Sequence, residues 1–464
     1  MRTSVHTGDL AIPSLDGLRA VAVAIVVAAH LGLRQWIPGE FGVTIFFFLS
    51  GFLITTLLRR EFERTGRISL RRFYLRRALR LLPPFYLVLG LASLPTLVGV
   101  IAGQTLRLDA VIPQMLYMSN YQVVQTGWWV GRAPGTAIYW SLAVEEHFYL
   151  AFPVLFLLLR HRLPRPRRQL AVLLGICAAV LAWRCILVFA LHAGNDRTYV
   201  ATDTRIDSLL FGCALAVHGN PVLDHDAATR RRWRELWLPV GVAGLLLSFL
   251  IRDPQFQQSV RYTLQGAALV PIFVVAMRWH DWGLFRLLNL WWVRLLGALS
   301  YVVYLVHLTV FYTLGDPRLP LRSPGVRAAL SVLLTLAIAL TVHRLVERPC
   351  ARLRRRLSSG DARREGAAHG GPGPRQAGDL ELATEENGAL LHPEDPGACR
   401  GHRRRKVGAV PVIAHREHQP LLLRLEADHD ALRPAVPRDV AQGLLDDATE
   451  VACDLGGEAA RPRR

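Results

Sequence analysis

One apolar stretch is decisive: Asp16-Gly17-Leu18-Arg19-Ala20-Val21-Ala22-Val23-Ala24-Ile25-Val26-Val27-Ala28-Ala29-His30. On an α-helix, the eleven steps from Arg19 to His30 rise about 16 Å and return to nearly the same azimuth. The two side chains are therefore expected on one face of a helix. If Arg19 lies at the cytoplasmic headgroups, His30 lies near the middle of a hydrocarbon core about 30 Å thick, where an ionisable side chain is costly and usually functional.

The rest of the chain has the composition of a multi-pass membrane protein. Hydrophobic residues make up 52% of the 464 residues, and the mean hydropathy is positive. The apolar residues form long blocks instead of alternating with a period of 3.6 or 2. Ten such blocks lie at about 18–33, 41–58, 78–101, 138–159, 169–190, 204–219, 235–251, 262–277, 295–314 and 325–346. We predict an all-α integral membrane protein with about ten transmembrane helices. The sixth block is short, so it could be tilted, broken or interfacial.

Arginines mark every second connection between these blocks. They are concentrated at residues 59–80, 160–168, 230–234 and 278–294, and again at 348–356 after the last block. The positive-inside rule then predicts that both termini are cytoplasmic. The same distribution accounts for the formal net charge of +19, so no nucleic-acid partner is predicted.

A cleaved signal peptide is the alternative interpretation of the first block. Arg19 would form its basic region and Val27-Ala28-Ala29 its cleavage site, which would make His30 the new N-terminus. Acidic residues at Asp9 and Asp16 and the many following spans favour a membrane span instead.

The composition changes near residue 358 to Gly, Pro, Arg, Asp and Glu with little periodicity. We predict a membrane-embedded domain at residues 1–357 and a disordered tail at 358–464. The histidines of the tail have no metal-ligand spacing and the six cysteines form no CxxC motif, so no metal site is predicted.

Arg77 and Arg80 begin the third block three residues apart, on one helix face. Guanidinium groups so placed could bind phosphates by bidentate hydrogen bonds at the cytoplasmic mouth of the protein. A basic collar that only holds the span in position explains them about equally well.

Two carboxylates lie inside the fourth block, in Tyr139-Trp140-Ser141-Leu-Ala-Val-Glu145-Glu146-His147-Phe-Tyr149. Adjacent helical residues point about 100° apart, so at most one glutamate easily faces His30. We predict that Glu145 orients the His30 imidazole, with Ser141 and Tyr149 on the same face. An ion pair with Arg184 or Arg205 is the structural alternative, and Glu146 and His147 are assigned to packing or pairing.

Ser50 and His307 are weaker candidates. Ser50 lies in Phe48-Leu49-Ser50-Gly51-Phe52, where small residues usually allow close helix packing, so a nucleophilic role is a minority interpretation. His307 lies near the middle of the ninth block and could either line a cavity or bond a neighbouring carbonyl group.

The chain resembles the membrane-bound acyltransferase 3 family in seven motifs that follow one another in the family's order over residues 12–357. They are Leu15-Asp-Gly-Leu-Arg19-x10-His30, Ser50-Gly51-Phe52-Leu-Ile, Arg77-Ala-Leu-Arg80, Trp140-Ser-Leu-Ala-Val-Glu145-Glu-x-Phe-Tyr149, Thr202-Asp203-Thr204-Arg205-Ile-Asp207, Ser300-Tyr-x-x-Tyr-Leu-x-His307 and Val346-Glu347-Arg348-Pro349. The chain departs from the family pattern at Thr44, His147 and Val306, which puts the identity of the acceptor in doubt more than the activity.

The resemblance implies an O-acyltransferase of the bacterial cytoplasmic membrane, in the class that transfers groups other than aminoacyl groups. Acetyl-CoA or another acyl-CoA would be the co-substrate, with no tightly bound cofactor, and its phosphates would meet Arg77 and Arg80. His30 would act as general base or take the acyl group transiently, with Arg19 and Glu145 beside it. Possible further cavity residues are Ser50, Tyr149, Asp203, Arg205 and His307.

The expected acceptor is a hydroxyl group of a glycan or of a lipid-linked saccharide. A macrolide or another secondary metabolite is the alternative acceptor. A transporter of an anionic solute is the competing class of protein, since it too would need arginine, glutamate and histidine inside the membrane. The absence of an internal repeat or of paired broken spans in the sequence disfavours it.

Overall fold

The computed structural model describes residues 12–36, 38–98, 105–128, 130–224, 230–316, 319–321 and 323–354. The chain divides into two compact units, Met1–Pro393 and Glu394–Arg464, and all described residues belong to the first. These residues form helices and connections without a β-strand. The tail predicted at 358–464 lies outside the described residues.

Eight helices in this part of the chain are long and apolar enough to cross a membrane. They are Leu15–Leu33 (α1, Leu15–Ala28, with η1, Ala29–Leu33), Gly39–Thr65 (α2), Leu70–Leu97 (α3), Thr136–Arg162 (η2, Thr136–Tyr139, with α6, Trp140–Arg162), Pro166–Ala190 (α7, Pro166–Cys185, with η3, Ile186–Ala190), Trp233–Leu250 (η4, Trp233–Trp237, with α11, Leu238–Leu250), Trp291–Leu314 (α14) and Pro324–Arg354 (α15, Pro324–Val342, with η6, His343–Glu347, and the turns after it). A ninth span results if α13 (Arg261–Arg278) and η5 (Gly283–Asn289), which meet at a bend of 72°, are taken together. The protein is therefore an all-α, multi-pass membrane protein.

The sixth apolar block differs from the other nine. It forms α9 (Thr202–Val217), a continuous helix of 16 residues. This is shorter than the roughly 20 residues that a transmembrane helix needs, so α9 is not among the spans given above. Nearly every residue of α9 is buried, because α2, α7 and α13 pack around it. Each of the ten predicted spans thus corresponds to a helical segment among the described residues, but one of these segments, α9, is enclosed by its neighbours.

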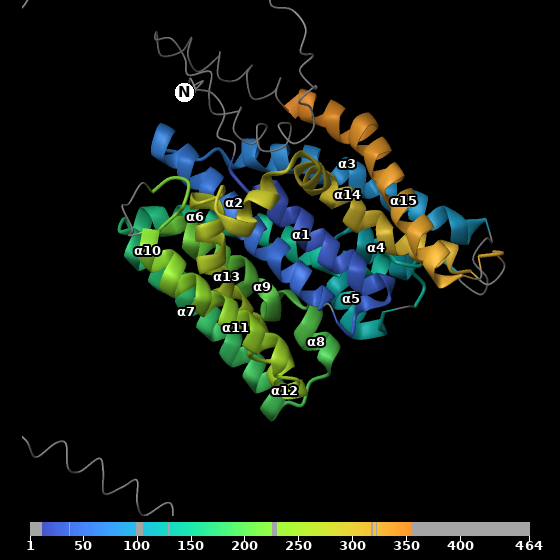
Figure 1. Ribbon diagram of the computed structural model, residues 1–464, viewed down its shortest axis with the longest axis horizontal. Coiled ribbons are helices and arrows are strands. Elements are labelled where there is room, and N and C mark those ends of the chain that lie inside the picture. The colour runs from blue at the N-terminus through green and yellow to red at the C-terminus, as the bar shows by residue number, and fades with distance from the viewer. Residues whose placement is uncertain are drawn as a thin grey trace, which may run out of the picture. The chain divides into compact units, whose positions relative to one another are not determined.

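The connections contain shorter helices: α4 (Leu108–Met115), α5 (Ser119–Thr126), α8 (Asn195–Val200), α10 (Arg230–Arg232) and α12 (Pro254–Gln258). In Figure 1, α15 lies at one edge of the described helices beside α14, and α7 and α11 lie toward the opposite edge. Between them, α1 packs against both α2 and α14.

Glycines allow the closest helix contacts. A Cβ atom at Gly212 of α9 would overlap the Phe48 carbonyl oxygen of α2, and one at Gly51 of α2 would overlap the Leu209 carbonyl oxygen of α9. The crossing of α1 and α14 likewise depends on Gly297, where a Cβ atom would overlap the backbone of Asp16. This agrees with the packing role expected for the small residues around Ser50.

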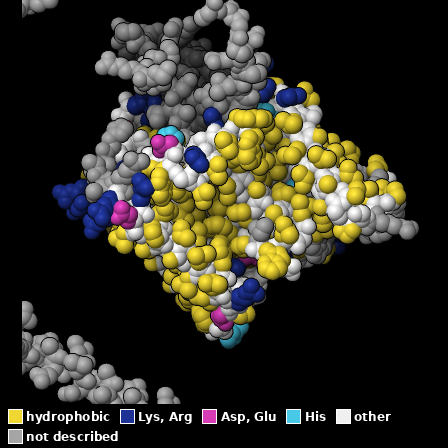
Figure 2. All heavy atoms as spheres, viewed as in Figure 1, with side chains coloured by type: hydrophobic (Ala, Val, Ile, Leu, Met, Phe, Trp, Pro, Cys, Tyr) yellow, Lys and Arg dark blue, Asp and Glu magenta, His cyan; other side chains and the backbone are white. Residues whose placement is uncertain are grey.

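The surface of the described helices is largely apolar. Figure 2 shows hydrophobic side chains covering most of one face, with charged side chains mainly around its rim. Exposed leucines such as Leu94, Leu150, Leu246 and Leu333 come from four different spans. Apolar side chains on this scale suit contact with lipid tails.

Candidate functional site

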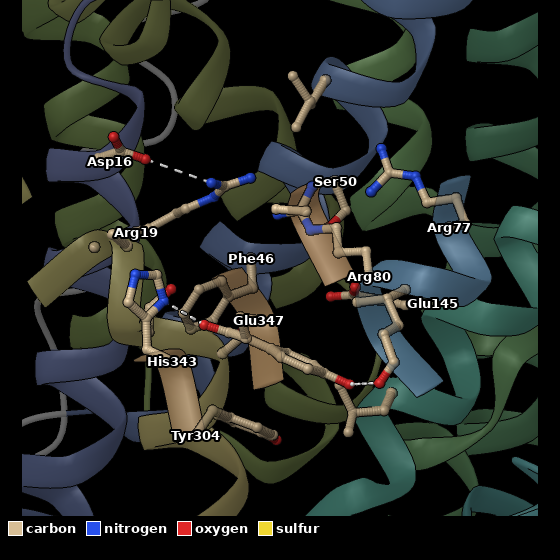
Figure 3. A pocket seen from close by; sticks show the side chains of 18 of the residues that line it. Asp16, Arg19, Phe46, Ser50, Arg77, Arg80, Glu145, Tyr304, His343 and Glu347 are labelled. Atoms are coloured by element: carbon tan, nitrogen blue, oxygen red, sulfur yellow. Dashed lines mark hydrogen bonds and ion pairs between the residues drawn. The ribbon is translucent and has the colours of Figure 1, made fainter. Parts of the chain in front are cut away.

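A cavity of about 420 Å³ opens among α1, α2, α3, α6, α14 and the end of the α15 span. Arg19, Ser50, Arg77, Arg80 and Glu145 line it from four of these helices (Figure 3). Because Tyr304 and Glu347 also line this cavity, six of the seven motifs on which the sequence prediction rested meet at one place.

The cavity is strongly basic. Arg348, Arg352 and Arg354, from the last turns of the α15 span, line it together with the arginines of α1 and α3. The carboxylates that line it are Asp16, Glu145 and Glu347. Six guanidinium groups against three carboxylates create a positive potential that attracts an anionic ligand. The sequence prediction had explained these three arginines by topology, and had named Arg348 also as part of the last family motif, without a role in a cavity.

The position of Arg77 and Arg80 within α3 separates them from the basic collar. Arg77 is only 5% exposed, and its guanidinium carbon lies 5.3 Å from the centre of the Tyr149 ring. The neighbouring Arg76 instead forms a salt bridge of 3.2 Å with Glu61 of α2. Of these arginines, Arg77 and Arg80 are the two that reach the cavity, whereas Arg76 ties α3 to α2.

Glu145 lies among the groups that define the cavity. Its Oε2 atom accepts a hydrogen bond of 2.7 Å from the Tyr149 hydroxyl, and the charges of Arg77 and Arg80 act on its carboxylate. The alternative partners proposed from the sequence are engaged elsewhere. Arg184 binds Asp207 through two hydrogen bonds of 3.0 and 2.7 Å, and Arg205 donates to the Thr44 hydroxyl at 3.2 Å.

His30 lies in a second cavity, which corrects the prediction that it shares a site with Arg19. This cavity has a volume of about 250 Å³, lies between α1, α14 and α15, and is lined mainly by apolar side chains. The helix α14 contributes Tyr301 and Tyr304 to the first cavity but Val303 and His307 to the second. Arg19 and His30 are eleven residues apart along α1 and its π-helical continuation η1, about 16 Å of helix rise, and each lines a different cavity.

The partner of the His30 ring is also different from the one predicted. His30 Nδ1 lies 3.1 Å from Nε2 of His307, and the two ring centres are 5.1 Å apart. Glu145 was expected to orient His30, but its hydroxyl partner is Tyr149 in the first cavity. The second imidazole lies next to His30 because α14 packs directly against α1.

Tyr304 lines the first cavity and lies beside His307 of the second, although sequence reasoning gave it no role. It lines the first cavity, its ring centre lies 5.8 Å from that of His307, and its hydroxyl oxygen is 2.7 Å from Ser141 Oγ. The spacing Tyr304-x-x-His307, which makes the two side chains neighbours on α14, is the signal that could have pointed to it.

Asp203 and Arg205 line neither of these two cavities. Asp203 binds Arg197 and accepts a hydrogen bond of 2.7 Å from the Trp183 indole. Arg205 is fully buried, with its guanidinium carbon 3.8 Å from the centre of the Tyr262 ring. Both residues hold α9 against its neighbours, and neither contributes to the two cavities that contain the other candidate residues.

Among the described residues, no group of three or more His, Cys, Asp or Glu side chains is placed to hold a metal ion.

Comparison with known proteins gives the family context of this site. A family model described as an acyltransferase domain matches residues 12–344. The chain is 32% identical over 350 residues to the O-acetyltransferase OatA of Staphylococcus aureus (strain NCTC 8325 / PS 47), a match that covers 73% of this chain and 57% of the relative. It is 31% identical over 364 residues to the peptidoglycan O-acetyltransferase OatA of Listeria monocytogenes, covering 73% of this chain and 55% of that protein. The chain thus spans little more than half the length of these relatives. No solved structure matches it.

Proposed function

We propose, since the chain belongs to the acyltransferase 3 family, that it transfers an acyl group, with acetyl as the first choice, from cytoplasmic acyl-CoA to a hydroxyl group of a glycan or lipid-linked saccharide. The enzyme would work in the bacterial cytoplasmic membrane. The observation that carries the proposal is the basic cavity in which Arg77 and Arg80 lie beside Glu145.

The donor side of the proposal rests on charge. Coenzyme A carries several phosphate charges, and arginine binds phosphate oxygens through paired, charge-assisted hydrogen bonds. Arg77, Arg80 and the three arginines at the end of the α15 span offer such donors around one cavity. The phosphates would remain among these arginines while the thioester end of the pantetheine arm passes toward Tyr304.

The chemical step assigns one proton transfer to His30. As general base, its ring nitrogen takes the proton of the acceptor hydroxyl while the oxygen attacks the thioester carbonyl carbon. The carbon–sulfur bond then breaks, and the proton passes to the leaving thiolate. In the alternative route, the same nitrogen attacks the thioester carbonyl carbon and the coenzyme A thiolate leaves. The acceptor hydroxyl then attacks the acyl-imidazole, the carbon–nitrogen bond breaks, and the hydroxyl proton passes to the thiolate.

The acceptor proposal rests on the relatives. The printed name of the Listeria protein specifies peptidoglycan, and the Staphylococcus protein is named an O-acetyltransferase. A glycan hydroxyl is therefore the first acceptor to test for this chain.

The deciding experiment measures thioester consumption by the purified full chain in lipid nanodiscs. With acetyl-CoA and a peptidoglycan fragment or lipid-linked saccharide, an acyltransferase releases free thiol and yields an acylated acceptor. An anion transporter or a structural protein releases none. Acylation of a macrolide but of no glycan would leave the donor chemistry in place and replace the acceptor.

A further inference from the structure

The buried histidine of α14 has a proton position that its neighbours determine. His307 is 4% exposed, and its Nδ1 atom lies 2.8 Å from the Tyr304 carbonyl oxygen and 3.1 Å from that of Val303. A carbonyl oxygen can only accept a hydrogen bond, so the nitrogen that faces both must carry the proton. His307 is therefore protonated at Nδ1.

The other nitrogen of the same ring is then a hydrogen-bond acceptor. A doubly protonated His307 would be a buried cation among apolar side chains with a neutral imidazole as its partner, which is a costly arrangement. In the neutral ring, Nε2 has a lone pair, and it lies 3.1 Å from His30 Nδ1. The His30 nitrogen must donate this hydrogen bond. The Val26 carbonyl oxygen, one turn earlier in α1, is a second acceptor beside the His30 ring.

The proton position on His307 also determines which nitrogen of His30 is basic. With its proton on Nδ1, neutral His30 has its lone pair on Nε2, the ring nitrogen turned away from His307. His30 is also the more accessible ring of the pair and lines the second cavity. The basic nitrogen of the pair thus belongs to the more accessible of the two rings.

We infer that His307 is a positioning residue that fixes the His30 tautomer and orients its ring, so that His30 Nε2 carries out the proton or acyl transfer. The inference rests on the proposed function of His30, and it holds for both routes, because each needs a lone pair on Nε2. When Nε2 takes the hydroxyl proton, His30 becomes an imidazolium whose Nδ1–H still donates to His307. That proton then leaves from Nε2 to the thiolate, so His307 neither gains nor loses a proton.

Two variants separate this role from simple packing. His307→Leu fills similar space without an acceptor, whereas His307→Gln can place an amide oxygen near the position of Nε2. Groups that hydrogen-bond and orient a metal-binding imidazole are typically worth about 10- to 100-fold in activity, and we expect the same range for this pair. We expect His307→Leu to lower kcat by that factor with KM for acetyl-CoA changed less than about threefold, and His307→Gln to recover a large part of the loss. His147→Gln is the matched control, since His147 bonds the Thr202 hydroxyl at 2.7 Å outside both cavities.

A measurement independent of activity reads the tautomer directly. Nitrogen-15 NMR of the full chain in nanodiscs, with labelled histidine and assignment by the His30→Gln and His307→Gln spectra, should show His30 and His307 both protonated at Nδ1. Protonation of His30 at Nε2, or an unchanged kcat in His307→Leu, overturns the inference. If both histidines are protonated at Nδ1 but the protein transfers no acyl group, the proposed function is wrong, whereas the inferred tautomers of His30 and His307 are correct.

Discussion

The guanidinium carbon of Arg77 lies 5.3 Å from the centre of the Tyr149 ring, and the hydroxyl of that ring donates to Glu145. One tyrosine of α6 therefore contacts both the proposed phosphate-binding arginine of α3 and the carboxylate beside it. A cation over an aromatic face is held with little freedom, which favours a guanidinium group already oriented before a ligand arrives.

Replacement of Arg77 and Arg80 by glutamine tests the donor site. Hydrogen bonds to a charged group contribute about 1.5–3 kcal/mol, so we expect KM for acetyl-CoA to rise by roughly 10-fold or more for each variant. Steady-state kinetics at matched protein abundance in the membrane provide the measurement. Arg71→Gln is the control, because Arg71 is exposed and does not line the cavity. A loss of protein abundance with an unchanged KM would show that Arg77 and Arg80 act only as part of the basic collar that holds the span in position.

Glu145→Gln tests whether the negative charge in the cavity contributes to turnover. Glutamine keeps the size of the side chain and an oxygen for the Tyr149 hydroxyl, but a neutral acceptor binds about half as strongly as a carboxylate. We expect kcat to fall by roughly 5- to 10-fold with normal membrane insertion. Glu146→Gln provides the comparison, since Glu146 is next in sequence and does not line the cavity. Equal effects of both changes would argue against a specific role of Glu145.

The helices and part of the site could be predicted from the sequence because these features depend on local patterns. Apolar block length predicted the spans, and helical spacing placed Arg77 and Arg80 on one face. The pairing of His30 with His307 joins residues from the first and ninth blocks, and it depends on how α14 packs against α1. Helical periodicity contains no information about such a distant contact. The sequence prediction therefore chose Glu145, a carboxylate inside an apolar block, as the partner of His30.

The arginines at the end of the α15 span were missed for a related reason. Arg348, Arg352 and Arg354 follow a long apolar block, where the positive-inside rule already explains basic residues. Their additional role follows only from the path of the helix, which brings its last turns to the mouth of the cavity.

Reporter fusions test the predicted topology. Arg59 of α2 donates to Asp224 and to the Val217 carbonyl oxygen at the end of α9, so the ends of α2 and α9 lie on the same side of the membrane. Fusions after Gly66 and after Asp224 should both report the cytoplasm, whereas one after Gly194 should report the opposite side. A cytoplasmic signal at Gly194, or an external signal at either of the other two positions, contradicts the arrangement.

Gly212→Ala tests the close approach of α2 and α9. The added methyl group would overlap the Phe48 carbonyl oxygen, so the helices must separate or shift. Overpacking of this kind costs typically about 1–3 kcal/mol, and we expect a lower melting temperature of the purified protein in nanodiscs. Gly175→Ala on α7 has open space around the added atom and should be neutral or slightly stabilising. Equal melting temperatures for the two variants would show that this contact contributes little.

The most direct test of the chemistry is His30→Gln. Glutamine can replace one hydrogen bond to His307 but cannot accept the hydroxyl proton or carry an acyl group, because its amide is not basic. General-base catalysis contributes about 10²- to 10⁴-fold in rate, so turnover should fall by at least roughly 10²-fold in a protein that still inserts and binds acetyl-CoA. Arg19→Gln, measured beside it, should weaken donor binding, because Arg19 lines the basic cavity and His30 does not. The readouts are thiol release and the KM for acetyl-CoA at matched abundance. Near-normal turnover of His30→Gln combined with an inactive His307→Gln would move the reacting nitrogen from α1 to α14 and reverse the roles of the two histidines.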